Sequence, residues 1–161
     1  TKDDSEQRSF RNEYIVPFVL LAVYGIANQY SSVESGATDE DVDKVAPCLW
    51  NGTVNLITRS KIGHVPRLLI EVIYNEGFSG IAGSLDEKVK LLNSNGQPFT
   101  DDEEFAIRTA KDFIVDITDV NHRLLEIKEK IDKINLWCDY ELQVRGIDEL
   151  KSSFSGKLIE K

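Results

Sequence analysis

The 161-residue sequence contains no methionine, only two cysteines, two histidines and four prolines. Its longest apolar run, residues 14–27, is interrupted by a proline and a glycine and is shorter than the ~20 residues that a transmembrane helix needs. It also shows no secretory signal pattern. Cys48 and Cys138 are far apart and form no CxxC pair, so we expect both to be buried thiols in a reducing compartment, the cytoplasm. The short apolar run and the missing signal pattern lead us to expect no membrane contact. Since the sequence begins at Thr1 and lacks methionine, we expect a fragment of a longer protein.

Motifs of common enzyme classes are absent as well. The sequence has no HExxH, CxxC, GxSxG or Walker pattern, and His64 and His122 have no partner at metal-ligand spacing. The glycine-rich stretch 77–83 lacks the Lys-Ser/Thr of a phosphate-binding loop, and we interpret it as a flexible hairpin. The acidic clusters 39–43 and 101–104 fit helix starts, where acids favour the helix dipole. We therefore predict no catalytic residue, no metal site and no cofactor.

What is present indicates one globular domain over residues 1–161, with 1–12 and 147–161 peripheral. The predicted order is close to βαββαβ, the ferredoxin-like or RRM-like α+β fold, in which two helices cover one face of an antiparallel sheet, with an added hairpin. The loops are expected at 28–37 and 75–84. The other predicted elements are a strand at 14–27, a helix starting after Thr38 with a kink or break at Pro47 or Gly52, a strand at 68–74, an edge strand at 85–92, a strand at 112–118, a helix at 120–134, a strand at 137–144 and a weak helix or tail at 148–158.

Residues 101–135 allow two interpretations. Apolar residues follow an unbroken 4,3 spacing from Ala106 to Ile134, which would make one helix of about 50 Å. The β-branched run at 112–118 instead favours a strand, followed by a second helix. We predict the split, and the continuous helix is the alternative. We also predict that Trp50 and Trp137 are core anchors.

Positive charge gathers in one short segment of a chain whose formal net charge is -9. Between Thr58 and Leu68 there is no carboxylate, while Arg59, Lys61 and Arg67 are cationic and His64 lies among them. Phosphate is the natural ligand of such a patch, because guanidinium forks bind it through two parallel hydrogen bonds. A solvated loop without a ligand is the competing interpretation.

Two strings carry a family resemblance. EYIVPFVLLAVYGIANQY (residues 13–30) and LWNGTVNLITRSKIGHVPRLLIEVIY (residues 49–74) resemble the Cas7-type backbone subunits of type I CRISPR surveillance complexes, the Cascade assemblies, of subtype I-B. The resemblance is good over roughly residues 10–92 and looser beyond. The family has an earlier half with no counterpart in this sequence, so the resemblance identifies the chain as a C-terminal portion of a larger protein. His64 also departs from the family, in which glutamine is common at that position.

The resemblance implies a non-catalytic role in antiviral defence. Copies of such subunits pack along a CRISPR guide RNA, together with other Cascade subunits, and target DNA pairs with the guide. The subunits have an RRM-type palm, and a separate nuclease cuts the DNA. By this resemblance the RNA-binding residues of this chain are Arg59, Ser60, Lys61, His64, Arg67, Asn51 and Asn55.

Two other functions stay open. The chain could be an assembly module whose basic loop docks on an acidic surface of the next copy, without touching RNA. Ribonuclease activity, as in related type III backbone subunits, would need a loop aspartate that the sequence does not place. Binding of RNA should weaken steeply with salt, which distinguishes it from pure assembly.

Overall fold

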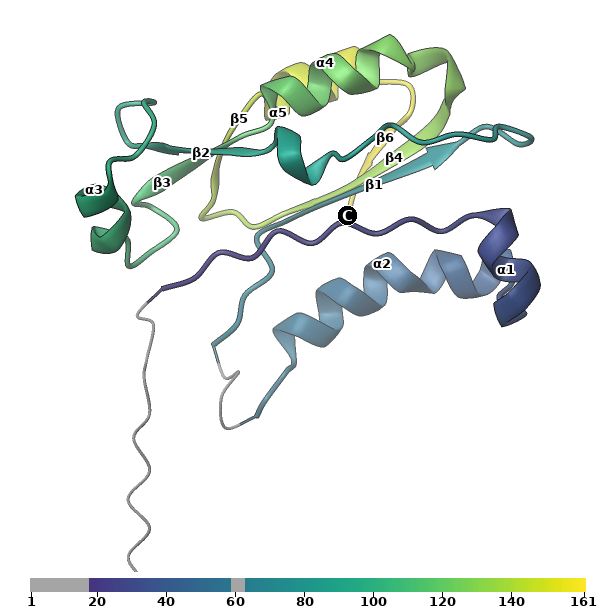
Figure 1. The fold of residues 1–161 in the computed structure, drawn as a ribbon, viewed down its shortest axis with the longest axis horizontal. Helices are drawn as coiled ribbons and strands as arrows, with labels where there is room; N and C mark the ends of the chain where they lie inside the picture. The colour runs from purple at the N-terminus through teal and green to yellow at the C-terminus, as the bar shows by residue number, and fades with distance from the viewer. Residues whose placement is uncertain (1–17, 59–62) are drawn as a thin grey trace, which may run out of the picture.

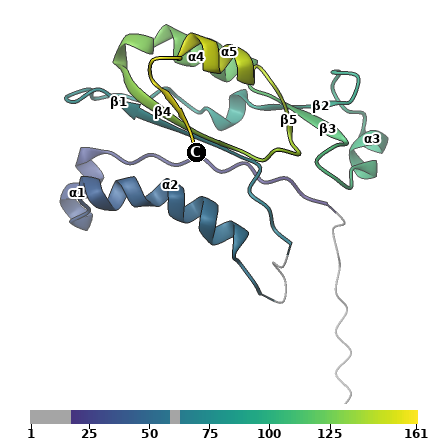
Figure 2. The same ribbon diagram turned by 180° about the vertical axis from the view of Figure 1, so that it is seen from behind.

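The computed structural model describes residues 18–58 and 63–161 and has the α+β architecture that the sequence predicts. Two three-stranded sheets lie at its centre, an arrangement compatible with a ferredoxin-like fold. Helices α4 (Thr118–Glu126) and α5 (Ile147–Ser153) lie on one side of the sheets, and α2 (Asp39–Val54) lies on the other (Figures 1 and 2). The fold class is therefore confirmed, although helices occupy both sides and not one.

Each sheet is mixed, whereas we expected a single antiparallel sheet. In the first sheet, β4 (Ile131–Cys138) pairs antiparallel with β1 (Leu68–Tyr74) and parallel with β6 (Leu158–Glu160). In the second, β3 (Phe113–Asp116) pairs antiparallel with β2 (Lys90–Asn93) and parallel with β5 (Gln143–Arg145). The first sheet is mixed because β6 pairs with β4, and the second because the strand predicted at 137–144 is divided. A turn at residues 139–142 divides it, so that its first part completes β4 and its last part forms β5.

The expected hairpin after β1 is wrong, because β1 pairs with β4 and not with the next strand. The connecting segment 75–84 is packed: Ala82 is buried, and its backbone N–H donates to the Tyr74 hydroxyl at 2.9 Å. The Arg123 side chain donates a hydrogen bond to the carbonyl of Ala82. A short 3-10 turn, η1 (Asp86–Lys88), then precedes β2, which lies at the edge of its sheet as predicted but begins only at Lys90.

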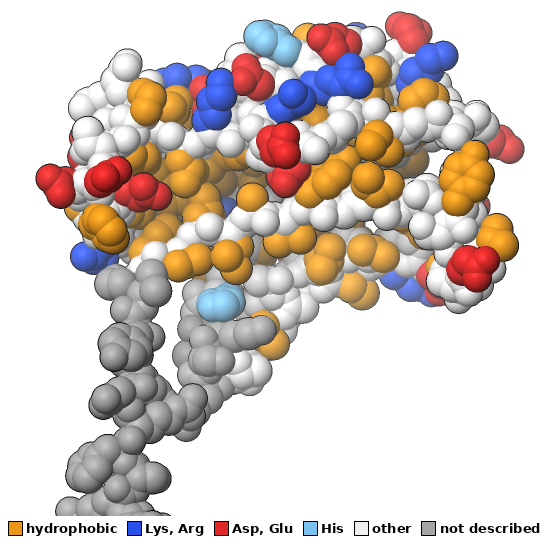
Figure 3. Space-filling view, viewed as in Figure 1, with side chains coloured by type: hydrophobic (Ala, Val, Ile, Leu, Met, Phe, Trp, Pro, Cys, Tyr) orange, Lys and Arg blue, Asp and Glu red, His pale blue; other side chains and the backbone are white. Residues whose placement is uncertain are grey.

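Residues 18–28 are not the predicted central strand, and residues 14–17 of that prediction lie outside the described part. The segment is extended, but none of the described strands pairs with it. Phe18 and Leu20 pack against the core, with the Phe18 ring 5.8 Å from that of Phe113, whereas Val19, Leu21 and Val23 are exposed. An apolar band crosses the face of the molecule in Figure 3. Apolar composition was the basis of the prediction, and it does not supply the backbone partner that a strand requires.

The loop predicted at 28–37 contains helix α1 (Gln29–Ser35). Asn28 caps it, because its side-chain oxygen accepts hydrogen bonds from the backbone N–H groups of Tyr30 and Ser31 at 3.0 and 2.9 Å. Gly36 ends the helix with a φ of 71°. Serine-rich composition favoured a loop, but the Asn cap and the left-handed glycine enclose one short helix.

Helix α2 begins where the sequence predicts, after Thr38, whose side chain forms a capping box with Asp41. It does not break at Pro47 or Gly52, and it ends at Val54, before the basic loop as expected. Only Ala46 of this helix is buried. Val45 and Leu49 are 51% and 55% exposed. Pro47 lies inside the helix without a backbone N–H, so position 47 cannot donate the usual hydrogen bond to the Asp43 carbonyl.

The split of residues 101–135 is confirmed. After α3 (Asp101–Ala106), β3 occupies the β-branched run, and α4 follows. The second helix is shorter than predicted: it ends at Glu126, and a 3-10 turn, η2 (Lys128–Lys130), leads directly into β4. Ile131 and Ile134 therefore belong to a strand, although they continue the helical spacing, because pairing with β1 decides their conformation.

The C-terminal segment 147–161, expected to be peripheral, contributes to the core. Leu150 of α5 and Phe154 are 0% and 1% exposed, and β6 completes the first sheet. Trp137 is buried as predicted, and Trp50 is half-buried. Within the described residues, no helix is both long and apolar enough to cross a bilayer. The largest fully buried side chains are Phe113, Phe154, Ile117, Leu124, Ile131, Ile134, Leu150 and Asn121.

Candidate nucleic-acid interface

The predicted RNA-binding residues surround the connection between α2 and β1. Asn51 is exposed in the last turns of α2, and Asn55 is the C-cap of that helix. The Asn55 backbone N–H and side-chain Nδ2 both donate to the Asn51 carbonyl, at 3.0 and 2.7 Å. The helix end therefore engages the Asn55 side-chain amide, whereas the Asn51 side chain lies in solvent.

Only part of the predicted basic segment belongs to the described residues. Arg59, Ser60 and Lys61 lie outside the described residues. The described chain resumes with Gly63, whose φ of 87° turns the backbone before the exposed His64. Half-buried Pro66 then leads into β1, so that His64 lies between a turn and the start of a strand.

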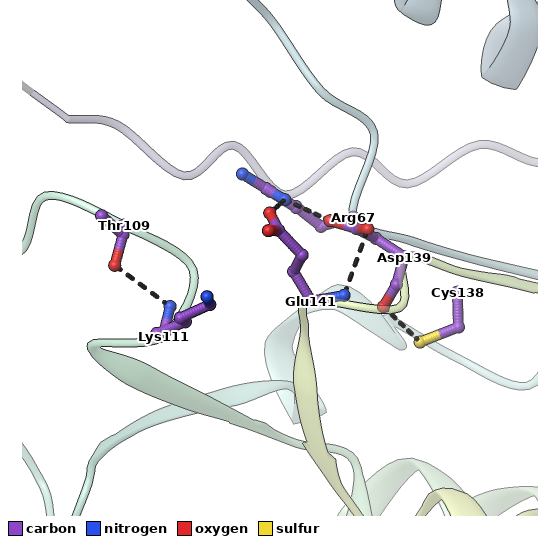
Figure 4. Close-up of polar contacts among 6 residues, drawn as sticks. All are labelled: Arg67, Thr109, Lys111, Cys138, Asp139 and Glu141. Atoms are coloured by element: carbon purple, nitrogen blue, oxygen red, sulfur yellow. Dashed lines mark hydrogen bonds and ion pairs between the residues drawn. The ribbon is translucent and has the colours of Figure 1, made fainter.

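Arg67 points into the protein, which the sequence did not predict. Its guanidinium forms an ion pair with Asp139 and lies 3.7 Å from a Glu141 carboxylate oxygen (Figure 4). The Arg67 and Asp139 side chains are only 18% and 10% exposed. The Asp139 backbone N–H also donates to the Arg67 carbonyl at 2.8 Å. These contacts tie the last residue of the loop to the turn that follows β4.

The sequence did not indicate that the turn after β4 lies beside the predicted RNA-binding residues. The turn places Tyr140, which is 94% exposed, next to a cavity of about 330 Å³. Trp50 from α2, Val65 and Pro66 from the loop, and Cys138 from β4 line this cavity. Asp139 lies 72 residues beyond Arg67, so no local spacing could have signalled the pair. An aromatic residue in an acidic turn was the one visible signal.

Cys138 is a weakly reactive thiol at this surface. Burial, followed by the charge of Asp139, raises the pKa of the Cys138 thiol, so the reactive thiolate is disfavoured at neutral pH. The thiol donates weakly to the Asp139 carbonyl at 3.6 Å. In the described residues, no group of three or more His, Cys, Asp or Glu side chains is placed to hold a metal ion. Exposed His64, Asn51 and Tyr140 offer an imidazole, an amide and an aromatic ring to a ligand.

Comparison with known proteins gives two results. Residues 1–118 match the model of the family described as CRISPR-associated protein Cas7. A protein of Haloferax volcanii named CRISPR-associated protein Cas7 is 26% identical over 135 residues. That alignment covers 83% of this chain and 37% of the relative, so the chain spans well under half of the relative's length.

Proposed function

Since the chain belongs to the Cas7 family of CRISPR-associated proteins, we propose that it is a non-catalytic, RNA-binding part of a type I Cascade backbone subunit, of subtype I-B. Copies of the protein pack beside one another and beside other Cascade subunits along a guide RNA in the cytoplasm. Target DNA is reached by pairing with the guide. The main support for RNA binding is the basic segment between Thr58 and Leu68, which contains no carboxylate.

The basic loop contacts the phosphates of the guide. Arg59 and Lys61 supply charge, Ser60 and the exposed side chain of Asn51 supply hydrogen-bond donors, and His64 lies beside them. Phosphate contacts require charge and donor geometry but carry no sequence information. The loop therefore binds guides of any sequence equally well.

Arg67 and Asn55 have a different role in this proposal from the one that the sequence predicted. Asp139 and Glu141 hold the Arg67 guanidinium in a half-buried position, and Asn55 caps α2. Both fix the ends of the basic loop, which limits the conformational entropy that it loses on binding RNA. They are positioning residues, and the phosphate contacts come from the residues between them.

The test is RNA binding by single-site variants. Arg59→Ala or Lys61→Ala should weaken binding to a CRISPR repeat-spacer RNA, measured by fluorescence anisotropy, for all spacer sequences alike. The slope of log affinity against log salt should flatten by about 0.7–0.9 per lost phosphate contact. Lys130→Ala is the matched control, because it removes the same charge from an exposed turn outside this region. An equal effect of the control variant would refute the proposed site.

An assembly module is the second candidate function. The first turns of α2 and α3 are acidic and exposed, and they offer a docking surface for the basic loop of another copy. In that case Arg59→Ala and Lys61→Ala would bind guide RNA normally but fail to form multimers in analytical ultracentrifugation. If neither property changed, the loop would be a solvated connection only.

A further inference from the structure

Tyr140 presents its ring to solvent from a turn that is held in place. It is 94% exposed, the highest value among the large hydrophobic side chains of the described residues. The Glu141 backbone N–H donates to Asp139 Oδ1 at 3.3 Å, and the Leu142 N–H donates to the Asp139 carbonyl at 3.1 Å. Leu142 is buried, and the Arg67 guanidinium binds the Asp139 carboxylate (Figure 4). A ring on a fixed turn loses little conformational entropy when a ligand covers it.

The cavity of about 330 Å³ lies beside this ring, and much of its wall is apolar. Trp50 and Val54 from α2 and Val65 and Pro66 from the loop line it. Val54 and Val65 are 56% and 49% exposed, so the apolar surface continues from the cavity to the outside. The volume lies at the lower end of the range for small-molecule sites, roughly 300–1,000 Å³, which suits one planar ring system.

The charged groups around the ring largely offset one another. The Arg67 guanidinium contacts the carboxylates of both Asp139 and Glu141, so the turn carries one excess negative charge. Lys161, which also lines the cavity, supplies one positive charge. Such a surface favours an occupant whose inserted part is uncharged, because no unbalanced charge is present to compensate the loss of its hydration.

The cavity between α2 and the β1–β4 pair has no comparable aromatic surface. Its aromatic residue, Trp137, is only 7% exposed. Two of its polar side chains also bind each other, since Asn135 Nδ2 donates to Glu71 Oε2 at 2.6 Å. Of these two cavities, therefore, the one beside Tyr140 combines open space with an exposed aromatic face.

We propose that the Tyr140 ring stacks on one unpaired base of the RNA whose phosphates the basic loop contacts. This inference rests on the proposed function and extends it from the phosphates to a base. Continuity favours an RNA base as the occupant, because Val65 and Pro66 belong to the same carboxylate-free segment as Arg59 and Lys61. A strand bound to that segment by its phosphates lies next to the cavity. Since every base has an aromatic face, the stack accepts any base.

The first experiment compares variants of exposed aromatic residues by fluorescence anisotropy with oligo(U), oligo(A) and oligo(C). Tyr140→Ala should lower the affinity about 5-fold or more for all three, since one stacked base contributes about that much. Tyr140→Phe keeps the ring and should retain most of the affinity. Phe105→Ala, which removes an 80% exposed ring from α3, is the matched control and should bind normally. No loss in Tyr140→Ala, or an equal loss in Phe105→Ala, would overturn the proposal.

The second experiment uses a strand of the same length without bases, which keeps every phosphate. The unsubstituted chain should bind oligo(U) more tightly than this abasic strand, and Tyr140→Ala should lose most of that preference. Tyr140→Ala should also keep the salt dependence of the unsubstituted chain, because it loses no phosphate contact. Equal preference for oligo(U) in both proteins would refute the stack.

The stack and the phosphate contacts fail in different ways. If Arg59→Ala flattens the salt slope but Tyr140→Ala binds RNA normally, the stack is wrong and the phosphate contacts stand. Weak binding by Tyr140→Ala with normal binding by Arg59→Ala would support the stack and refute the phosphate contacts. If Tyr140→Ala binds RNA normally but forms no multimers in analytical ultracentrifugation, the ring contacts another copy of the chain and the stack is refuted.

Discussion

Residues 107–158 and residues 18–57 are both rich in apolar side chains, but only the first region buries them. Phe113, Leu124 and Leu150 are at most 1% exposed, whereas Leu21 and Val23 are 72% and 85% exposed. The difference shows that apolar composition is not sufficient for burial. A segment must also have a place in a sheet or against it.

Strand β4 explains why the first region is well packed. It is the central strand of its sheet, with β1 on one side and β6 on the other, and four consecutive residues from Ile134 to Trp137 are buried. Residues 18–28 have no such neighbours, and α2 buries only Ala46. Stability should therefore be unevenly distributed, with little of it contributed by the second region.

The largest effect should come from Phe154→Ala in the well-packed region. This side chain is 1% exposed and belongs to the core, so its loss should lower the free energy of unfolding by about 3–5 kcal/mol. Urea denaturation followed by circular dichroism measures it. Val54→Ala, at a position 56% exposed in α2, is the comparison and should cost under about 0.5 kcal/mol. Similar losses in both variants would abolish the contrast between the regions.

An intermediate effect is expected at the ion pair between Arg67, which precedes β1, and Asp139 in the well-packed region. Asp139→Asn leaves the Arg67 guanidinium half-buried with a weaker partner and should cost about 2 kcal/mol, between the values for exposed and buried pairs. Glu40→Gln removes a carboxylate from the exposed pair with Lys44, at 2.8 Å, and should cost about 0.5 kcal/mol or less.

Both values come from urea denaturation at neutral pH. The double variant Arg67→Met, Asp139→Asn should recover part of the loss if the unpaired charge is its cause. No recovery would mean that the pair acts through packing alone.

The smallest effect should come from Val23→Lys in the extended segment. Because Val23 is 85% exposed, the substitution should change the free energy of unfolding by less than about 0.5 kcal/mol. It should also raise the solubility limit, since a charge interrupts an exposed apolar strip. Precipitation with ammonium sulfate measures the second effect. A loss above about 2 kcal/mol would show that the segment is packed in solution, contrary to the contrast drawn above.

The fold could be predicted in outline because several signals in the sequence are local. Thr38 and Asp41 define the start of α2, and the β-branched run at 112–118 identifies β3 correctly. Two features were not predicted: residues 18–28 pair with none of the described strands, and a turn divides 137–144. Both depend on which segments pair, and pairing between residues far apart in the chain leaves no local pattern.

The candidate site shows the same limit. Concentrated charge made the basic loop visible, but Arg67 had the same charge as Arg59 in the sequence, and only the fold shows that Asp139 holds it. The positions of Tyr140 and of the Asn135–Glu71 pair were not predicted, because each depends on contacts with residues of other elements. Electrostatic composition can be read from a sequence, whereas the partner of each charge cannot.

The register of the first sheet has a consequence for synthesis on the ribosome. Leu68 of β1 pairs with Cys138, and every pair in this ladder joins residues far apart in the chain. At about 5–20 residues per second, β1 waits roughly 3 to 15 seconds after translation before β4 exists. Loop closure over that distance also slows folding relative to local hairpins. During this interval the apolar face of β1 needs protection, so the nascent chain is a natural client for chaperones that bind extended hydrophobic segments.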